Sequence, residues 1–224
     1  MSIRNWPDSE KPREKLFSSG TSALSDGELL AVLLTTGFRG QSALALGREL
    51  LLNFGDLTGV LAAKGEDLLK IPGLGSAKSA PLQAVREIAL RQDISELKSK
   101  EALTSTNKAK QFLQRKFHHC EIEIFCAIFL DAQHKVLAID DLFQGTIDGA
   151  AVYPREVVKR CLAHNAAALI LAHNHPSGVA EPSQADIAIT LKLKKALEAI
   201  DVRVLDHLVV GSNEVISMTE QALI

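Results

Sequence analysis

The hydrophobic pattern of the chain changes near residue 101, and this change constrains the fold more than any other feature. From residue 12 to about 91, apolar stretches with helical spacing are separated by turns that contain glycine, and no strand pattern interrupts them. Residues 92–106 are rich in Lys, Glu and Ser, and from residue 122 onward β-branched and aromatic runs alternate with helical segments. We therefore predict a small all-α domain over residues 1–100, followed by an α/β (α+β) domain over residues 101–224.

The first domain is expected to contain short helices that depend on packing against each other. Ser25 and Glu28 have the spacing of a capping box ahead of an apolar run, so a helix is expected to begin there. Further helices are predicted over residues 42–52 and 57–63, and an Ala- and Leu-rich helix is predicted to end near Arg91. Helices of this length are marginal alone, so their apolar faces must share a core.

The second domain is expected to combine strands and helices. Its most apolar β-branched and aromatic run ends at a turn after Leu130. The expected strands cover residues 122–130, 135–140, 167–172 and 202–210, and the expected helices cover residues 154–163 and 183–199. This alternation predicts a sheet covered by helices on at least one face.

Composition narrows the class of protein. Hydrophobic residues make up 46% of the chain and the formal net charge is -2, which predicts a globular protein without a global attraction to nucleic acids or membranes. No signal peptide or apolar run of membrane-spanning length is present, so a cytoplasmic protein is expected. The cysteines are odd in number and lack C-x-x-C spacing, which favours reduced thiols.

The richest chemistry follows the apolar strand expected at residues 167–172. His173 and His175 are two residues apart, so in an extended backbone both imidazoles point to the same side. Ser183 is a helix N-cap candidate, and Asp186 would lie in the first turn of that helix, aimed back toward the end of the strand. Two imidazoles and one carboxylate suit Zn²⁺ and leave a fourth position for water, as in catalytic zinc sites.

Each of these pieces also has an ordinary structural explanation. A single histidine is more often a surface or core residue than a ligand, and Ser-x-x-Asp by itself is a helix cap. Their combination at one strand–loop–helix junction favours a metal site. We therefore predict one zinc ion per chain, bound by His173, His175 and Asp186.

The spacing of the two histidines, the serine and the aspartate matches the His-x-His-x7-Ser-x2-Asp signature of the JAMM (MPN-type) metalloproteases. More narrowly, residues 153–157, 171–178 and 205–207 resemble the bacterial RadC, or UPF0758, proteins, and this resemblance covers nearly the whole chain. The resemblance implies a central mixed sheet flanked by helices, zinc as the cofactor, and hydrolysis of peptide or isopeptide bonds. It does not imply a physiological substrate.

In the JAMM pattern, a glutamate at the start of an upstream strand accepts the proton of the attacking water. Glu123 fits this position best, because it opens the strand expected at residues 122–130. Glu121 has the same parity along the strand and Glu156 lies in a predicted helix, so both remain alternatives. The resemblance also implies that Ser183 hydrogen-bonds the tetrahedral intermediate, although a helix cap alone would explain this serine.

The sequence gives less evidence of a function for Asp206 and for the histidines outside the signature. Asp206 and His207 lie on the strand expected at residues 202–210, where either could orient a metal ligand or belong to the core. The remaining histidines are expected at the surface and are given no role: His118, His119, His134 and His164.

The sequence Ile-Pro-Gly-Leu-Gly at residues 71–75 resembles the turn of a helix-hairpin-helix motif. In such a turn, backbone N–H groups at a helix N-terminus and a nearby lysine approach a phosphate. Gly73, Gly75 and Lys78 are therefore candidates for sequence-independent DNA binding. The other explanation is that the turn only joins two helices and packs the domain.

Functions of different classes are consistent with these features. The first is a zinc-dependent hydrolase, a metalloprotease that acts on peptide or isopeptide bonds of a protein or peptide substrate. The alternative is a DNA-binding or DNA-repair-associated module whose zinc-binding domain is a non-catalytic scaffold. A third hypothesis is hydrolysis of a small amide or a phosphodiester, but two metal ions would help phosphodiester cleavage and the sequence contains one such site.

Overall fold

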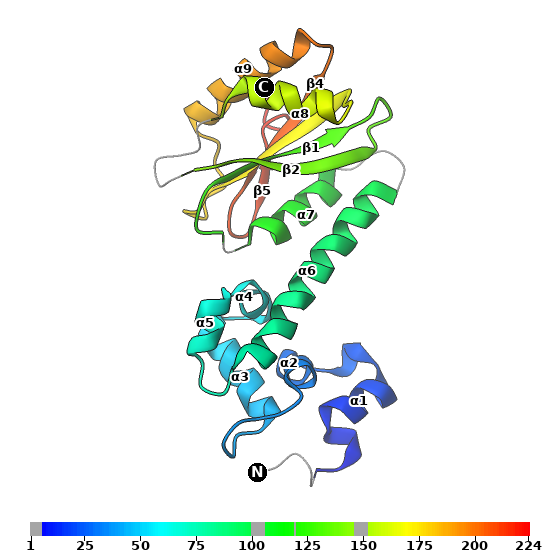
Figure 1. Cartoon of the computed structure of the whole chain (residues 1–224), viewed down its shortest axis with the longest axis vertical. Helices are drawn as coiled ribbons and strands as arrows, with labels where there is room; N and C mark the ends of the chain where they lie inside the picture. Colours follow the sequence, from blue (N-terminus) through cyan, green and yellow to red (C-terminus); the bar gives the residue numbers. More distant parts are fainter. Residues whose placement is uncertain (1–5, 100–105, 119, 146–151) are drawn as a thin grey trace. The chain divides into compact units, whose positions relative to one another are not determined.

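The structure is a computed structural model that describes residues 6–99, 106–118, 120–145 and 152–224. The chain divides into two compact units, Met1–Ala89 and Leu90–Ile224. This division falls within helix α6 (Ser76–Ser99; Figure 1), whereas the sequence pattern placed the domain boundary near residue 101. Residue 101 lies outside the described residues, as does His119.

Helix α6 is longer than predicted, because it continues past Arg91 to Ser99. Leu90, Ile94 and Leu97 recur with helical spacing in this polar stretch. Leu97 is buried in a core of the second unit, and the other two pack against the same core. Packing of these three side chains therefore explains why a stretch that resembles a linker is helical.

The first unit is helical in its described part, as the sequence predicts. Ser25 and Glu28 form the expected capping box, in which the Ser25 backbone N–H donates to the Glu28 carboxylate at 2.8 Å. The helices other than α6 are α1 (Pro12–Ser19), α2 (Asp26–Leu34), α3 (Ala43–Phe54), α4 (Leu57–Ala62) and α5 (Gly65–Lys70), with 3-10 turns η2 (Asp8–Glu10) and η3 (Thr21–Ala23). Their shared core consists of Leu30, Leu34, Leu46, Leu50, Val60, Leu68, Leu74 and Leu82.

The second unit contains a mixed five-stranded sheet with the order β2-β1-β3-β4-β5. Strand β3 is antiparallel to β1 and parallel to β4, while β1–β2 and β4–β5 are antiparallel pairs. The predicted mixed sheet flanked by helices is confirmed. The strands are β1 (Ile124–Leu130), β2 (Val136–Gln144), β3 (Ala168–Asn174), β4 (Arg203–Val210) and β5 (Val215–Ser217).

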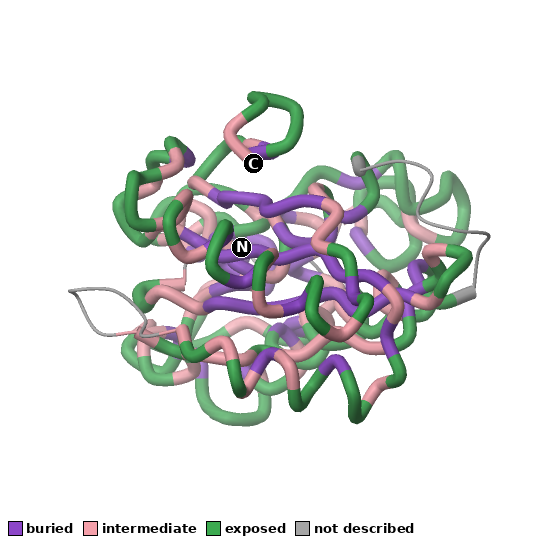
Figure 2. Tube along the Cα trace, turned by 90° about the horizontal axis from the view of Figure 1, so that it is seen from above, coloured by how far each residue is buried: buried purple, intermediate pink, exposed green. Residues whose placement is uncertain are grey.

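Helices cover both faces of this sheet. Helix α7 (Thr106–Phe117) packs on one face, and α8 (Pro154–Ala163) and α9 (Gln184–Glu198) cover the other (Figure 1). Strand β3 is buried along its whole length, and such buried stretches are purple in Figure 2. Its residues alternate between the two cores, because successive side chains of a strand point to opposite faces.

Three strands differ from their predicted bounds by two residues or more. Strand β3 ends at Asn174 rather than at residue 172, so His173 lies within the strand. Strand β1 begins at Ile124 rather than residue 122, and β2 extends to Gln144 rather than ending at residue 140. Strand β2 lies at the edge of the sheet, where charged side chains are tolerated, so the strand can extend past Asp140 and Asp141. Asp140 Oδ2 lies 2.7 Å from His164 Nε2, and Asp141 forms an ion pair with Lys116. Strand β5 and helix α7 were not predicted.

No helix within the described ranges is both long enough and apolar enough to cross a membrane.

Candidate metal centre

The side chains of His173, His175 and Asp186 meet at the end of strand β3. Their nearest atoms are separated by 2.9 Å between the two Nε2 atoms, 3.3 Å from His173 Nε2 to Asp186 Oδ1, and 3.5 Å from His175 Nε2 to Asp186 Oδ2. Four tetrahedral ligands at roughly 2.0–2.1 Å from zinc lie about 3.3 Å from each other. With one atom taken from each residue, the three candidate ligand atoms lie within 4.8 Å of one another, so the group could hold a metal ion.

Hydrogen bonds orient both imidazoles for this role. His175 Nδ1 lies 2.8 Å from the Val179 carbonyl oxygen, and His173 Nδ1 lies 2.8 Å from His207 Nε2. A carbonyl oxygen only accepts, so His175 Nδ1 carries the proton and the neutral ring has its lone pair on Nε2. His173 is 1% exposed but the side chains of His175 and Asp186 are 20% and 16% exposed, so the group is accessible from one side.

Burial and hydrogen bonding set the charges in the group. Burial alone would raise the pKa of the Asp186 carboxyl, but hydrogen bonds with His173 and His175 outweigh burial and hold this pKa far below its usual range. The hydrogen bond with Asp186 raises the pKa of His175, and the negative charge of Glu123 acts in the same direction. Burial lowers the pKa of His207 well below the ordinary histidine value, which favours its neutral form.

Ser183 and Asp186 form a capping box at the start of α9. The Asp186 backbone N–H donates to Ser183 Oγ at 3.2 Å, and the Ser183 backbone N–H donates to Asp186 Oδ2 at 2.7 Å. Ser183 Oγ also donates its proton to Oδ2 at 2.6 Å. The same contacts that begin the helix therefore hold the carboxylate in front of the two histidines.

The side chain of Asn174 holds the chain on both sides of Glu123. Asn174 Oδ1 accepts from the Ile124 N–H at 2.8 Å, and Nδ2 donates to the Ile122 carbonyl at 3.0 Å. The Glu123 carbonyl accepts from the Gly145 N–H at 2.8 Å. The segment just before β1 is therefore fixed by a side chain, which explains why the strand begins after Glu123 rather than before it.

The register of β1 and β3 places Glu123 near the metal group. Phe125 pairs with His173, so in the same antiparallel register the half-buried Glu123 falls opposite His175. By strand alternation its side chain shares the face of Phe125, whose ring is stacked with that of His173 at 6.1 Å between centroids.

The other acidic candidates lie elsewhere. Glu156 lies at the surface in the first turn of α8, and its carboxylate contacts Lys159 at 3.0 Å. Glu121 is exposed in the bend before β1. Asp206 is buried but accepts hydrogen bonds from Ser217 and from the backbone N–H of Thr219, so it holds the C-terminal segment.

In the predicted phosphate-binding turn of the first unit, the lysine and one glycine already make contacts within the protein. Lys78 Nζ donates to the carbonyl oxygens of Gly37 at 2.9 Å and Gly73 at 3.2 Å. Gly73 has φ +88°, and a Cβ there would lie 2.5 Å from the Cβ of Phe38. A Cβ at Gly75 would meet open space. Packing therefore explains Gly73 and Lys78 without a phosphate, whereas it does not explain Gly75.

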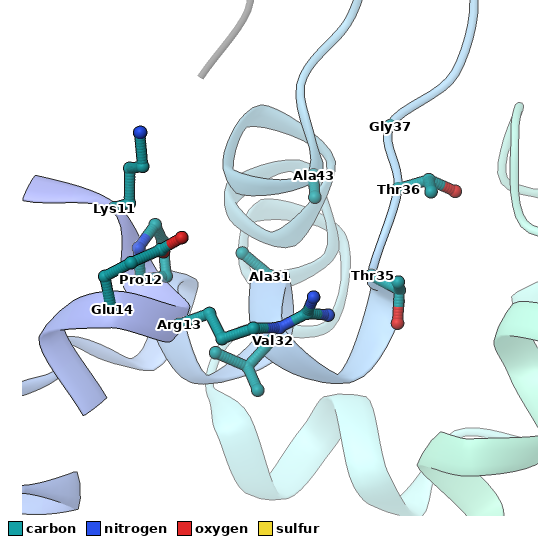
Figure 3. A pocket seen from close by; sticks show the side chains of 10 residues that line it. All are labelled: Lys11, Pro12, Arg13, Glu14, Ala31, Val32, Thr35, Thr36, Gly37 and Ala43. Atoms are coloured by element: carbon teal, nitrogen blue, oxygen red, sulfur yellow. The ribbon is translucent and has the colours of Figure 1, made fainter. Parts of the chain in front are cut away.

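A cavity of about 460 Å³ lies in the first unit, beside helices α1 and α2 (Figure 3). Its charged side chains are Lys11, Arg13 and Glu14, and Thr35 and Thr36 supply hydroxyl groups. None of the residues that line it belongs to the metal group.

Two family models match separate parts of the chain. A family model described as RadC-like JAB domain matches residues 103–223, and one described as UPF0758 N-terminal matches residues 3–80. The chain belongs to the RadC-like UPF0758 family. It is 55% identical to a UPF0758 protein of Azotobacter vinelandii, with 99% of each chain covered, and 52% identical to one of Nitrosomonas eutropha, with 100% of each covered. A UPF0758 protein of Stutzerimonas stutzeri is 56% identical, with 98% of each chain covered.

A JAB domain with this His-His-Asp group is compatible with a metal-dependent hydrolase. The His-x-His-x7-Ser-x2-Asp spacing leads directly to the candidate ligands. It does not reveal Asn174, whose amide holds the segment around Glu123, or Thr190, a buried residue of α9 whose hydroxyl contacts His207. Asn174 stands between two candidate ligands on a strand, and alternation places it on the opposite face. That position was the available signal for Asn174, whereas Thr190 has no local signal.

Proposed function

We propose that this protein is a zinc-dependent hydrolase of peptide or isopeptide bonds. The observation that supports it best is the approach of the two imidazole Nε2 atoms to each other and to the two carboxylate oxygens of Asp186, at 2.9 to 3.5 Å, at the partly exposed end of a buried strand. Two imidazoles and one carboxylate are a ligand set that suits zinc and leaves a coordination position open. The substrate is proposed to be a protein or peptide.

A bound zinc ion would polarise a carbonyl group and lower the pKa of a water molecule toward about 7. The chain must supply the group that accepts the proton. Glu123 is the proposed base, because it is half-buried, falls opposite His175 in the register, and contributes to the raised pKa of that histidine. Glu156 is less suited, since its carboxylate pairs with Lys159 at the surface.

Ser183 is proposed to act in two ways. In the present arrangement its single hydroxyl proton is donated to Asp186, so the serine supports a ligand. A contact between this hydroxyl and the oxyanion of the reaction requires the hydroxyl to turn away from the carboxylate. Ser183→Ala is expected to weaken both metal binding and hydrolysis, because it removes both contacts.

The function is tested by metal content and hydrolysis in matched variants. Elemental analysis of the full chain should give about one zinc per chain for the wild type and for Glu123→Gln, and little for His175→Ala. Hydrolysis of a library of peptides and lysine-linked isopeptides should be lost in Glu123→Gln and retained in Glu156→Gln, the control for loss of an acidic side chain.

Two results would contradict the proposal in different ways. A wild type that binds no zinc when zinc is supplied excludes a zinc hydrolase. A wild type that binds zinc but cleaves nothing supports the alternative, in which the domain is a scaffold attached to a DNA-binding module.

A further inference from the structure

Behind the metal group lies a buried series of hydrogen bonds that starts at one candidate ligand and returns to another. His173 Nδ1 lies 2.8 Å from His207 Nε2. His207 Nδ1 contacts the hydroxyl of Thr190, and this hydroxyl also contacts the backbone carbonyl oxygen of Asp186. Thr190 and His207 are 0% exposed, so neither has access to bulk water. We call this series of hydrogen bonds, from His173 through His207 and Thr190 to the Asp186 carbonyl, the ligand circuit.

The direction of the protons in the ligand circuit follows from the carbonyl group. A carbonyl oxygen cannot donate, so the single hydroxyl proton of Thr190 is directed to the Asp186 carbonyl. Thr190 then has only lone pairs for His207, so His207 Nδ1 carries a proton. A neutral His207 therefore presents the lone pair of Nε2 to His173, and His173 Nδ1 must donate.

This order of protons has a consequence at the other nitrogen of His173. A neutral imidazole with its proton on Nδ1 has its lone pair on Nε2, and Nε2 is the atom that faces His175 and Asp186. The competing tautomer, with the proton on Nε2, could donate to Asp186 Oδ1 at 3.3 Å, but it would bring the lone pairs of His173 Nδ1 and His207 Nε2 together at 2.8 Å, which is costly in a buried site.

The walls of the ligand circuit are apolar, so water cannot easily replace a missing partner. The ring of Phe125 is stacked on His173 and meets His207 edge-on, at centroid distances of 6.1 and 5.3 Å. The sulfur of Met218 lies 4.0 Å from the Thr190 hydroxyl. Loss of the hydroxyl would therefore leave His207 Nδ1 unpaired.

We propose that Thr190 and His207 are positioning residues that select the metal-binding tautomer of His173 before the metal arrives. Thr190 does so without touching the metal, and the same hydroxyl holds the first turn of α9, which bears Asp186. The inference rests on the proposed zinc site but not on the identity of the substrate. Hydrogen-bond partners of metal-binding histidines commonly change metal affinity by about 10- to 100-fold.

The test compares the zinc affinity of full-length variants in competition with a chromophoric chelator. Thr190→Val keeps the shape of the side chain and removes the hydroxyl, so zinc affinity should fall about 10- to 100-fold, while Thr190→Ser should stay within about threefold of the wild type. Cys161→Ala removes a buried atom from the core on the same face of the sheet. This control should lose stability but not zinc affinity.

A metal-free measurement completes the test, because nitrogen chemical shifts of ¹⁵N-labelled histidine report which ring nitrogen is protonated. The expected result is a proton on Nδ1 in both His173 and His207. Equal zinc affinity of Thr190→Val and wild type, or a proton on Nε2 of His207, would overturn the inference and leave the hydrolase proposal intact. A wild type that takes up no zinc would instead overturn the hydrolase proposal. In that case the protonated nitrogens of His173 and His207 alone would test the proton order of the ligand circuit.

Discussion

Asn174 separates two histidines in the sequence and in the structure faces the opposite way from both. Its amide imitates a peptide group, since one atom accepts from Ile124 N–H and the other donates to the Ile122 carbonyl. A side chain thereby continues the pairing of β1 and β3 past the end of the strand. At the residue scale, the proposed base therefore depends on a neighbour that does not point toward the metal.

Replacement of Asn174 by Ala removes both of these hydrogen bonds. Each lost partner of a buried polar group costs about 1–3 kcal/mol, and Glu123 loses its fixed position. We expect kcat/KM for a cleaved peptide to fall at least about 10-fold, while zinc content stays near the wild-type value. Loss of zinc in parallel with activity would show instead that Asn174 supports the ligands.

The raised pKa of His175 predicts how metal binding depends on pH. In the metal-free protein, the contact of protonated His175 with Asp186 stabilises the fold fully below the ordinary histidine pKa of 6.5 and is lost as pH rises through the raised value. A metal needs the neutral ring, so zinc affinity should rise with pH across this window. Titration calorimetry in buffers of different ionisation enthalpy should detect proton release at about pH 6, and its absence would contradict the assignment.

At the scale of the elements, the glycine turn before α6 is held to a neighbouring loop by hydrogen bonds. Lys78 joins this turn to the loop at Gly37 by two hydrogen bonds to backbone oxygens. A lysine that is used in this way is not available to a phosphate unless those bonds break. Gly73 and Lys78 therefore have a structural explanation within the first unit, whereas Gly75 does not.

Lys78→Met distinguishes these two roles. The variant keeps most of the aliphatic chain but leaves two carbonyl oxygens without their donor, so stability of the first unit should fall by about 1–3 kcal/mol in urea unfolding. Lys70→Met is the matched control, because it removes only a surface pair with Asp67 and should leave the stability of the first unit close to that of the wild type. Unchanged stability together with weaker binding to duplex DNA would support the phosphate role.

At the scale of the whole molecule, the candidate metal links elements of one unit only. Its ligands come from the end of β3 and the start of α9, and both lie within Leu90–Ile224. A ligand that binds only the folded state stabilises the part of the chain whose folding forms the site. Metal binding is therefore expected to stabilise the second unit.

Chelation of the metal should lower the unfolding temperature of the second unit alone. A ligand at about 100 times its Kd contributes about 2.7 kcal/mol, so the shift should be several degrees in calorimetry. Fluorescence of Trp6, in the first unit, should report a transition that does not move. A single transition that shifts as a whole would show that the two units unfold together.

The sequence by itself determined the features that depend on neighbours along the chain. Strand alternation aligned His173 with His175, and capping chemistry put Asp186 at a helix start, so the candidate ligands follow from local spacing alone. The change of hydrophobic period likewise separated a helical part from a part with a mixed sheet. The structure brings the three side chains together and contains both kinds of secondary structure in these parts, because the period of a strand or helix is a local property.

Only the tertiary structure decided which distant residues complete the site. The parallel pairing of β3 with β4 brings His207 behind His173, and packing of α9 brings Thr190 to it, although no sequence spacing links the three. Packing also made a helix of the polar stretch that ends at Ser99. Long-range register and packing arise from the whole core at once, so a pattern along the chain does not contain them.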